Sequence, residues 1–578
     1  MSLINNTEKY LLNLVKDLGF EVESVPLVKS QLPQFGEYQI NVAMSLAKQA
    51  GKNPREIAQT IVDALDERFI NVNIQGPGFI NVSFSDKVLL DYLNESIDNF
   101  ENFIDKDTEM NTIVLDYGGA NIAKELHVGH LRCNIGEAIR RLLNLYGVKT
   151  ISDVHWGDWG TPMGQVILGI KNEQPDLPYF DPNFTGEYPS ESPVTNDDLG
   201  RIYPMSSKRC KEDEVYANEA RKITEELQKG NPGYRALWKH ILKVSKEYCN
   251  AVYEELNCKF DYSYGESDAY EYVYDVIDFL NEKGVTEKSD GALIMHVKTD
   301  EDNKEVPPLM LVKSDGGVGY DTAELGTIYQ REKDFHPTGI YYFTDNRQEL
   351  HFEQTFRGAL KSGMVPESMD FKFLGFGTIN GKDGKPFKTR DGGVMPLVKL
   401  IEEVKNKIEP NIKEDITGDE RIDVRNKLAI AALKYADLLP SRTTDYIFDI
   451  DKFTSFDGKT GIYIVYTATR IKSLLKRLNA SDDLKITLIP NQTVRDVLVK
   501  LTEISKVFNS SRRELTTSYI CEYVYELASL YNKFYTENNI SNESDEEVKN
   551  SYIALSKLVY NTISNILNVL AIDEVERM

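Results

Sequence analysis

The chain lacks the features of membrane proteins and of disulfide-stabilised secreted proteins. Its 578 residues include five cysteines, and no two of them form a Cys-x-x-Cys pair. This spacing argues against a structural zinc site and against a disulfide framework. No uninterrupted apolar stretch is long enough to cross a bilayer, and residues 1–20 have neither the basic start nor the apolar core of a signal peptide. We therefore expect a cytoplasmic protein without a membrane partner and without a structural metal.

Positive charge is also scarce. Lys and Arg number 67 against 91 Asp and Glu, which gives a net charge of −24 at pH 7. Most nucleic-acid binders are recognised by basic patches, so the composition alone disfavours RNA binding, although an acidic protein can still carry a local basic face. Hydrophobic residues make up 41% of the chain and charged residues 27%, as in ordinary globular proteins. A chain of this length is expected to form several domains.

The two ends of the chain have different hydrophobic patterns. Residues 1–106 combine helical periodicity with two alternating segments around Gly76-Pro77-Gly78, a strong turn signal, and this mixture predicts an α+β domain. Residues 421–578 repeat apolar positions at spacings of three and four, which predicts a bundle of amphipathic helices. A charged helical connector, 401–420, is expected before the bundle.

The middle of the chain, 107–400, is expected to form an α/β domain of the Rossmann type. A buried strand, Ile113-Val114-Leu115, precedes a loop with two glycines and then an amphipathic helix, and a second strand is expected at 150–154. The stretch from about 170 to 312 interrupts this pattern, first as a polar loop up to residue 200 and then mostly as helix. Strand-forming residues resume near 340–344. We therefore expect an insertion between the two halves of a parallel sheet.

The loop after the first strand contains His127-Val128-Gly129-His130, directly before the helix. A helix N-terminus favours anions. Gly129 would let a nucleotide base approach, and the two imidazoles can donate hydrogen bonds to phosphate. So short a motif, taken alone, is explained more simply as two histidines in a surface turn. Asn121 and Lys124 precede it and Leu131-Arg132 follow it at the spacing found in one family of enzymes, and it is this resemblance that reverses the balance.

A second segment, Gly381 to Arg390, combines glycines with several cations. These suit a triphosphate, because negative charge grows on the leaving pyrophosphate. Taken alone, however, Lys382-Asp383-Gly384-Lys385 is explained more simply as an ordinary hairpin turn.

Together, these motifs resemble those of the arginyl-tRNA synthetases, which are class I aminoacyl-tRNA synthetases. The first is similar to the "HIGH" signature and the second occupies the place of the "KMSKS" loop, although it reads Phe387-Lys388-Thr389-Arg390, a departure that many arginyl enzymes share. Further stretches that look like this family are 35–39, 76–81, 156–161, 319–324, 345–354, 442–449 and 456–461. The resemblance covers essentially the whole chain, with the motifs in the family's order.

The resemblance implies a multidomain enzyme with a Rossmann-type α/β catalytic domain and its connective insertion, an α+β N-terminal domain and an all-α C-terminal helical bundle. Such an enzyme activates arginine with ATP, giving arginyl-adenylate and pyrophosphate, and then transfers arginine to the 3'-terminal ribose of its tRNA. The N-terminal domain would contact the outer corner of the tRNA and the bundle its anticodon. Mg²⁺ would accompany ATP as part of the substrate, without a dedicated protein site. The family is usually monomeric, so we expect a monomer.

The resemblance also assigns roles to individual residues. The histidines would stabilise the triphosphate in the transition state and two lysines would neutralise pyrophosphate, so the expected catalytic residues are His127, His130, Lys124 and Lys388. The residues expected to bind ATP are His127, Gly129, His130, Gly377, Lys385 and Lys388. A guanidinium needs carboxylates or amide oxygens in a planar fork, and the residues expected to hold arginine are Asp116, Asn121, Tyr320, Glu324 and Gln348. At Glu324 the family has an aspartate, so this chain keeps the charge with one more methylene. His351 and Gln354 are expected to line the same cleft.

Other interpretations stay open at this stage. Asp116 and Glu324 can be solvated surface charges, although Asp116 follows a buried strand at the end where open α/β sheets bind ligands. A different class I synthetase is an alternative, but the acidic pocket and Asn121 favour arginine. A paralogue that binds tRNA without catalysis is another alternative, and the intact first signature and Lys388 argue against it.

Overall fold

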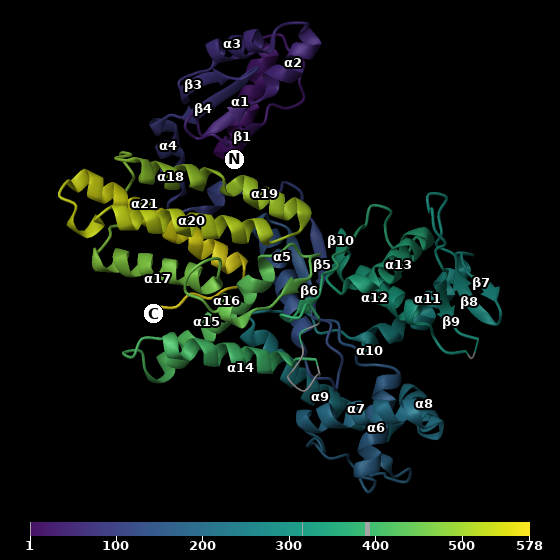
Figure 1. Ribbon diagram of the computed structural model, residues 1–578. Helices are drawn as coiled ribbons and strands as arrows, with labels where there is room; N and C mark the ends of the chain where they lie inside the picture. Colours follow the sequence, from purple (N-terminus) through teal and green to yellow (C-terminus); the bar gives the residue numbers. More distant parts are fainter. Residues whose placement is uncertain (1, 315, 386, 388–393) are drawn as a thin grey trace. The chain divides into compact units, whose positions relative to one another are not determined.

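The computed structural model contains a four-stranded parallel sheet that carries the candidate site (Figure 1). Its strands are β5 (Thr112–Asp116), β6 (Lys149–Asp153), β10 (Gly339–Tyr342) and β11 (Asp370–Phe373), in the order β11-β10-β5-β6. Helix α5 (Cys133–Leu145) connects β5 to β6, and the chain returns much later on the other side of β5 as β10. The direction of winding therefore reverses between β5 and β10, and ligands of such sheets bind at this point, outside the carboxyl ends of the strands.

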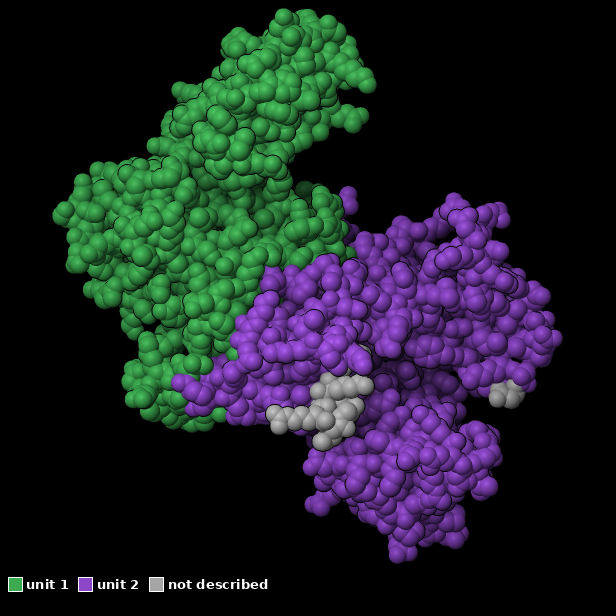
Figure 2. All heavy atoms as spheres, viewed as in Figure 1, with its two compact units in different colours: residues 1–108, 411–435, 454–578 green, residues 109–410, 436–453 purple. Residues whose placement is uncertain are grey.

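The structure describes residues 2–314, 316–385, 387 and 394–578. It divides into two compact units, which Figure 2 shows in green and purple. The first consists of residues 1–108, 411–435 and 454–578, and the second of residues 109–410 and 436–453. Among the described residues, no helix combines the length and the apolar character needed to traverse a membrane.

The central strand β5 forms where the sequence predicts it. Val114 and Leu115 are fully buried, as expected for a parallel strand that is covered on both faces. Helix α5 follows because its apolar residues recur at helical spacing, and Ile135, Ile139 and Leu142 are all buried. The helix does not begin directly after the histidines, since a 3-10 turn, η2 (Val128–Arg132), comes first.

The expected insertion separates β6 from β10. It contains α6 (Thr161–Glu173), α7 (Asn196–Glu212), α8 (Glu214–Gln228), α9 (Pro232–Glu255), α10 (Glu266–Ala269), α11 (Val273–Glu282) and an antiparallel sheet of β7 (Glu287–Ser289), β8 (Ala292–Met295) and β9 (Leu309–Val312). Helix α7 begins inside the stretch expected to be loop. Thr195 and Asp198 explain this start, because each side chain accepts a hydrogen bond from the other residue's backbone N–H in a capping box.

Further elements of the second unit complete the surroundings of the site. After β9 come α12 (Tyr320–Phe335), α13 (Glu349–Ser362), β12 (Ile379–Asn380), α14 (Leu397–Ile408), β13 (Tyr446–Ile447) and α16 (Ile450–Phe453). Strand β12 pairs in parallel with β13, outside the main sheet. Helix α15 (Gly418–Leu438) continues from the first unit into the second.

The first unit begins with an antiparallel sheet and its helices. The strands β1 (Leu27–Lys29), β2 (Tyr38–Ile40), β3 (Phe69–Gln75) and β4 (Phe79–Phe84) lie in the order β1-β2-β4-β3, with helices α1 (Leu3–Asp17), α2 (Val42–Ala50), α3 (Pro54–Ala64) and α4 (Asp86–Ser96). The predicted hairpin is confirmed, since β3 and β4 pair on either side of Gly76-Pro77-Gly78. Gly76 has φ +53°, a conformation that favours glycine.

The rest of the first unit is a helical bundle, as the sequence predicts. Its helices are α17 (Gly461–Arg477), α18 (Gln492–Thr502), α19 (Ile504–Glu514), α20 (Ser518–Glu537) and α21 (Glu546–Val569). In α17, Ile464, Ala468 and Ile471 are fully buried at spacings of four and three.

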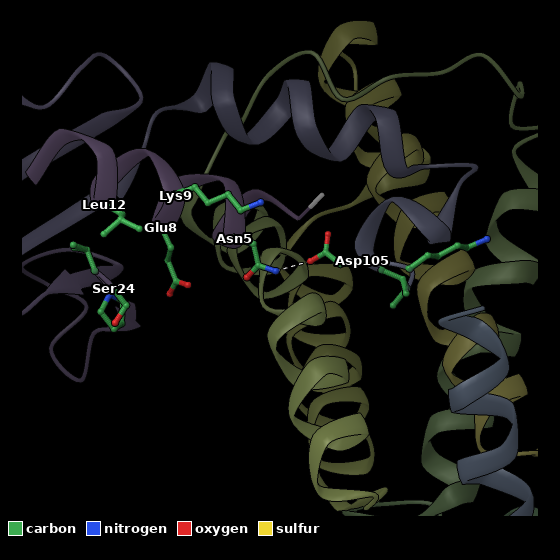
Figure 3. A pocket seen from close by; sticks show the side chains of 10 residues that line it. Asn5, Glu8, Lys9, Leu12, Ser24 and Asp105 are labelled. Carbon is green, nitrogen blue, oxygen red and sulfur yellow. Dashed lines mark hydrogen bonds between the residues drawn. The ribbon is translucent and has the colours of Figure 1, made fainter. Parts of the chain in front are cut away.

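The first unit also contains a pocket of about 590 Å³, lined by residues of α1 and of the segments 24–26 and 104–106. Figure 3 shows it from close by, with the hydrogen bond from the Asn5 amide to the Asp105 carboxylate. None of the residues expected to bind ATP or arginine lines this pocket, so it is separate from the candidate site.

Candidate active site

The two histidines of the first signature are held by hydrogen bonds within η2. His127 Nδ1 accepts from the Gly129 backbone N–H at 3.1 Å, and His130 Nδ1 accepts from the His127 backbone N–H at 3.0 Å. The two ring centroids are 4.1 Å apart. A Cβ at position 129 would lie 2.8 Å from the His127 ring, so this packing requires glycine there.

Both imidazoles are neutral at pH 7. Partial burial lowers the pKa of His127, and the nearby Lys124 lowers it further. Burial, with a further contribution from His127, lowers the pKa of His130 to about 3. Because each Nδ1 accepts a hydrogen bond, the hydrogen-bond pattern assigns the proton of each ring to Nε2. The signature therefore presents two uncharged N–H donors, and Lys124, exposed and 5.0 Å from the Tyr203 ring, supplies the nearby positive charge.

The residues that follow the second cationic segment lie directly against the first signature. Val128 N–H donates to the Met395 carbonyl at 2.9 Å, and Leu397 N–H donates to the Leu126 carbonyl at 2.8 Å. His127 and Pro396 form an antiparallel bridge between these bonds. The expected catalytic residue Lys388 lies outside the described residues. The two signatures are thus joined through their neighbours.

The described start of the second segment is a tight turn. Gly381 N–H donates to the Lys385 carbonyl at 2.8 Å, and Gly384 has φ +71°. Lys382 is paired with Asp449 at 3.1 Å, whereas the exposed Lys385 side chain has no hydrogen bond or ion pair within the described part of the chain. Gly377 packs against backbone, because a Cβ there would lie 2.6 Å from the Thr444 carbonyl carbon.

Charged residues gather at the carboxyl ends of β5 and β6. Arg331 of α12, which is 1% exposed, places Nη2 at 2.6 Å from Asp116 Oδ2 and at 2.9 Å from Asp153 Oδ2. His155 has φ +46°, and its Nδ1 lies 3.7 Å from Asp153 Oδ2. Burial alone would lower the pKa of His155, but Asp153 and Asp116 outweigh it and raise that pKa to about 9. Both Arg331 and His155 are therefore cationic at neutral pH.

Two carboxyl groups beside this cluster have no such partner. Glu324 of α12 is 7% exposed, and burial raises its pKa. Burial likewise raises the pKa of Glu266 to about 7; His155 opposes this effect, and Asp158 and Glu324 add to it. Within the described residues, neither side chain forms a hydrogen bond or an ion pair. Since a buried carboxylate without a partner is costly, this pair of acids favours a cationic ligand.

Tyr320 is another residue expected to bind arginine. Tyr320 lies one helical turn before Glu324, and the pKa of its hydroxyl is raised by burial and then by Glu324 and Glu266. Its ring centroid lies 4.7 Å from that of His351, which is itself paired with Asp321 at 3.1 Å. The charges of Glu324 and Glu266 therefore act on the Tyr320 hydroxyl.

Asn121 and Gln348, also expected to hold arginine, are both exposed. Asn121 pairs through its backbone with Gly157, where a Cβ would lie 2.3 Å from Asn121 Oδ1. Gln348 is exposed at the end of η5 (Asn346–Gln348), immediately before α13. Gln354, expected in the same cleft, donates a hydrogen bond to the Pro307 carbonyl at 2.5 Å.

Comparison with known protein families accounts for most of the chain. Residues 95–450 match the model described as "tRNA synthetases class I (R), catalytic domain", residues 4–84 match "Arginyl tRNA synthetase N terminal domain", and residues 464–578 match "DALR anticodon binding domain". The arginine–tRNA ligase of Alkaliphilus oremlandii is 43% identical over 586 aligned residues, which cover all of both chains. This chain belongs to the arginyl-tRNA synthetase family. The ligase of Agathobacter rectalis, 41% identical over 99% of the chain, is another similar relative.

Solved structures of arginyl-tRNA synthetases share the fold. The crystal structure of the Plasmodium falciparum enzyme superimposes with a TM-score of 0.81 at 24% identity and covers 100% of this chain and 99% of its own. The Thermus thermophilus enzyme gives a TM-score of 0.77 at 18% identity, with full coverage of both chains. The expected fold class, with its class I catalytic domain and helical C-terminal domain, is confirmed.

The sequence patterns of this arginyl-tRNA synthetase family member did not predict three residues near the candidate site, Glu266, Arg331 and His155. Arg331 had a usable signal, because it lies seven residues after Glu324 and so on the same face of α12. Glu266 had none, since it reaches the site only because Gly265 pairs with Trp156 in the loop after β6.

Proposed function

We propose that this chain ligates arginine to tRNA in two steps and that the pocket at the end of β5 selects the amino acid. As a class I synthetase, the enzyme uses ATP: the arginine carboxylate attacks the α-phosphate, the bond to the β-phosphate breaks, and pyrophosphate leaves. The terminal ribose hydroxyl of the tRNA then attacks the adenylate's carbonyl carbon, and AMP leaves. The observation that carries the choice of arginine is a pair of acids, Glu324 and Glu266, near the switch point of the sheet, whose side chains have no hydrogen-bond or ion-pair partner in the described part of the chain.

Arginine recognition rests on charge and shape. A guanidinium offers five N–H donors in a plane, and the carboxylates of Glu324 and Glu266 accept them with the Tyr320 hydroxyl beside them. One carboxylate oxygen of Asp116 pairs with Arg331, and the negative charge of Asp116 adds to the electrostatic potential around Glu324. Asn121 and Gln348, at the exposed edge, hold the amino-acid end. Lysine is disfavoured, because a point charge does not match a planar fork of acceptors.

ATP is bound mainly by the first signature. The Nε2–H groups of His127 and His130 donate to the phosphates in the transition state, and Gly129 allows close approach. Lys124, Lys385 and Lys388 neutralise the leaving pyrophosphate, and Gly377 keeps the strand before the second segment close to its neighbour. No side chain acts as a nucleophile, so catalysis consists of positioning and electrostatic stabilisation.

Mg²⁺ is proposed as part of the ATP substrate, bound through phosphate oxygens. In the described ranges of the chain, no group of three or more His, Cys, Asp or Glu residues is arranged to hold a metal ion. The ion would offset phosphate charge when bound, and the protein's own contribution stays with the histidines and lysines.

The tRNA is the larger partner. We propose that residues 1–106 contact its outer corner, that the insertion at about 170–312 within the catalytic domain 107–400 holds its acceptor end, and that the helical domain 421–578, which follows the connector 401–420, reads its anticodon. The match of residues 464–578 to an anticodon-binding domain supports the last assignment. The enzyme is proposed to act as a cytoplasmic monomer.

The direct test is arginine-dependent ATP–pyrophosphate exchange, measured with and without arginine tRNA, with lysine as the control amino acid. Exchange with arginine and not with lysine supports the proposal. Exchange that needs tRNA shows that the tRNA completes the active site, and exchange without it shows that the site is already assembled. A folded protein that binds tRNA but exchanges pyrophosphate under neither condition would be a binding paralogue.

A further inference from the structure

Arg132, two residues after the second histidine of the first signature, is a buried cation whose contacts lie far away in the sequence. Its side chain is 1% exposed. Nη1 donates to Asp437 Oδ1 at 3.1 Å, and Nη2 donates to the Arg442 carbonyl at 2.7 Å. The guanidinium carbon lies 5.5 Å from the ring centroids of both Phe376 and Tyr446. The planar guanidinium of Arg132 therefore forms hydrogen bonds along its edge and also lies close to two aromatic rings.

Most of these partners come later in the chain, and they contact the stretch that leads into the second cationic segment. The Arg442 carbonyl also accepts the Gly377 N–H at 3.1 Å, and the Arg442 guanidinium donates to the Gly375 carbonyl. Tyr446 lies in β13, which pairs with β12 immediately before Gly381. Its hydroxyl donates to Asp437 Oδ1 at 3.0 Å, the oxygen that Arg132 also contacts.

The arrangement ties the histidine turn to the entrance of the second segment. The exit of that segment is tied separately, through the backbone bonds of Leu126 and Val128 to Leu397 and Met395. Among the described side chains of η2, it is that of Arg132 that forms hydrogen bonds to Asp437 and to the Arg442 carbonyl.

We propose that Arg132 is a positioning residue for ATP, an inference that rests on the proposed function. It sets the distance between the Nε2–H donors of His127 and His130 and the strand that carries the second segment. Both sets of groups must bear on one triphosphate, and a displacement of about 1 Å can cost about a hundredfold in rate. Lysine cannot replace this group, because an ammonium is a point charge without the planar edge that reaches a carboxylate and a carbonyl together.

Arg132→Lys tests the inference in the full-length enzyme. We expect kcat for ATP–pyrophosphate exchange to fall about ten- to a hundredfold, while the arginine KM stays within about twofold of wild type. Arg140→Lys is the matched control. Arg140 lies on the following helix and pairs with the buried Glu137 at 2.8 Å, so it loses a similar contact without touching the second segment, and its exchange rate should be unchanged.

A second variant keeps the test decisive if Arg132→Lys does not fold. Tyr446→Phe keeps the ring beside Arg132 and removes only the hydrogen bond to Asp437, so its kcat for exchange should fall by about two- to fivefold at unchanged arginine KM. Exchange by both variants at the wild-type kcat would overturn the inference. So would a rise in arginine KM as large as the fall in kcat, because a general loss of structure would produce that pattern. Absence of exchange in the wild-type enzyme would instead overturn the proposed function.

Discussion

Arg331 Nη2 lies 2.6 Å from Asp116 Oδ2, so the protein places a guanidinium of its own at the edge of the pocket proposed for arginine. The same nitrogen reaches Asp153 at 2.9 Å. Glu324, on the same face of α12, has no such partner among the described residues. Arg331 thus pairs with the acids at the ends of β5 and β6, and Glu324 and Glu266 are the acids proposed to bind the arginine substrate.

Glu324→Gln should weaken arginine binding selectively. The amide keeps the shape but loses the charge, and a hydrogen bond to a charged group contributes about 1.5–3 kcal/mol. We therefore expect the arginine KM in ATP–pyrophosphate exchange to rise about ten- to a hundredfold and the ATP KM to stay within about twofold. Glu353→Gln, at a half-exposed acid of α13, is the control. Equal rises in both KM values would contradict the guanidinium role.

His130→Ala should slow activation rather than weaken arginine binding. Loss of one oriented transition-state donor costs about a hundredfold to a thousandfold in kcat. The imidazole is neutral at pH 7, with a pKa of about 3, so the defect should be the same at pH 7 and pH 8. Exchange rates measured at saturating substrates check this. Near-normal turnover of the variant would remove His130 from the mechanism.

Arginine binding should strengthen as the pH rises through about 7. Burial raises the pKa of Glu266 to about 7, so in the empty site this group is mostly protonated at pH 6 and mostly ionised at pH 8. Only the carboxylate attracts a guanidinium, and the arginine KM should therefore fall between these two values. The measurement is the arginine KM from pH 6 to pH 8 at constant ionic strength. Glu266→Gln should flatten this dependence, and an unchanged slope in that variant would assign it to another group.

Arg331→Met should destabilise the fold strongly. It removes the cation that Asp116 and Asp153 share, and breaking a buried ion pair from one side costs about 3–5 kcal/mol. Urea unfolding measures this loss. The double variant Arg331→Met/Asp153→Asn also removes one of the two acids that lose Arg331, so its free energy of unfolding should be partly restored. A double variant less stable than the single one would show that Asp153 does not depend on Arg331.

Local patterns predicted much of the fold. The β3–β4 hairpin follows from Gly76-Pro77-Gly78, and β5 follows from its apolar run, because turn chemistry and burial are encoded by neighbouring residues. The start of α7 at Asn196 is also encoded locally, in the capping box of Thr195. The polar composition of the surrounding residues nevertheless led us to expect a loop there.

The candidate site was predictable only in part. Histidine spacing located the turn proposed to bind phosphate, and the resemblance located Tyr320 and Glu324. The sequence could not predict which acid is already paired, because Asp116 and Glu324 both carry a carboxyl group and only the structure shows that Asp116 pairs with Arg331.

The sequence by itself determined the strand, the histidine turn and the amphipathic helix between Ile113 and Leu143, along with the family to which they belong. These features depend on residues within a few turns of one another. Only the tertiary structure decided that Arg331 pairs with Asp116, that Glu266 joins Glu324, and that Arg132 reaches Arg442. The physical reason is that such contacts are set by how the sheet, the insertion and the returning strands pack together, and a buried charge takes the partner that packing brings within reach.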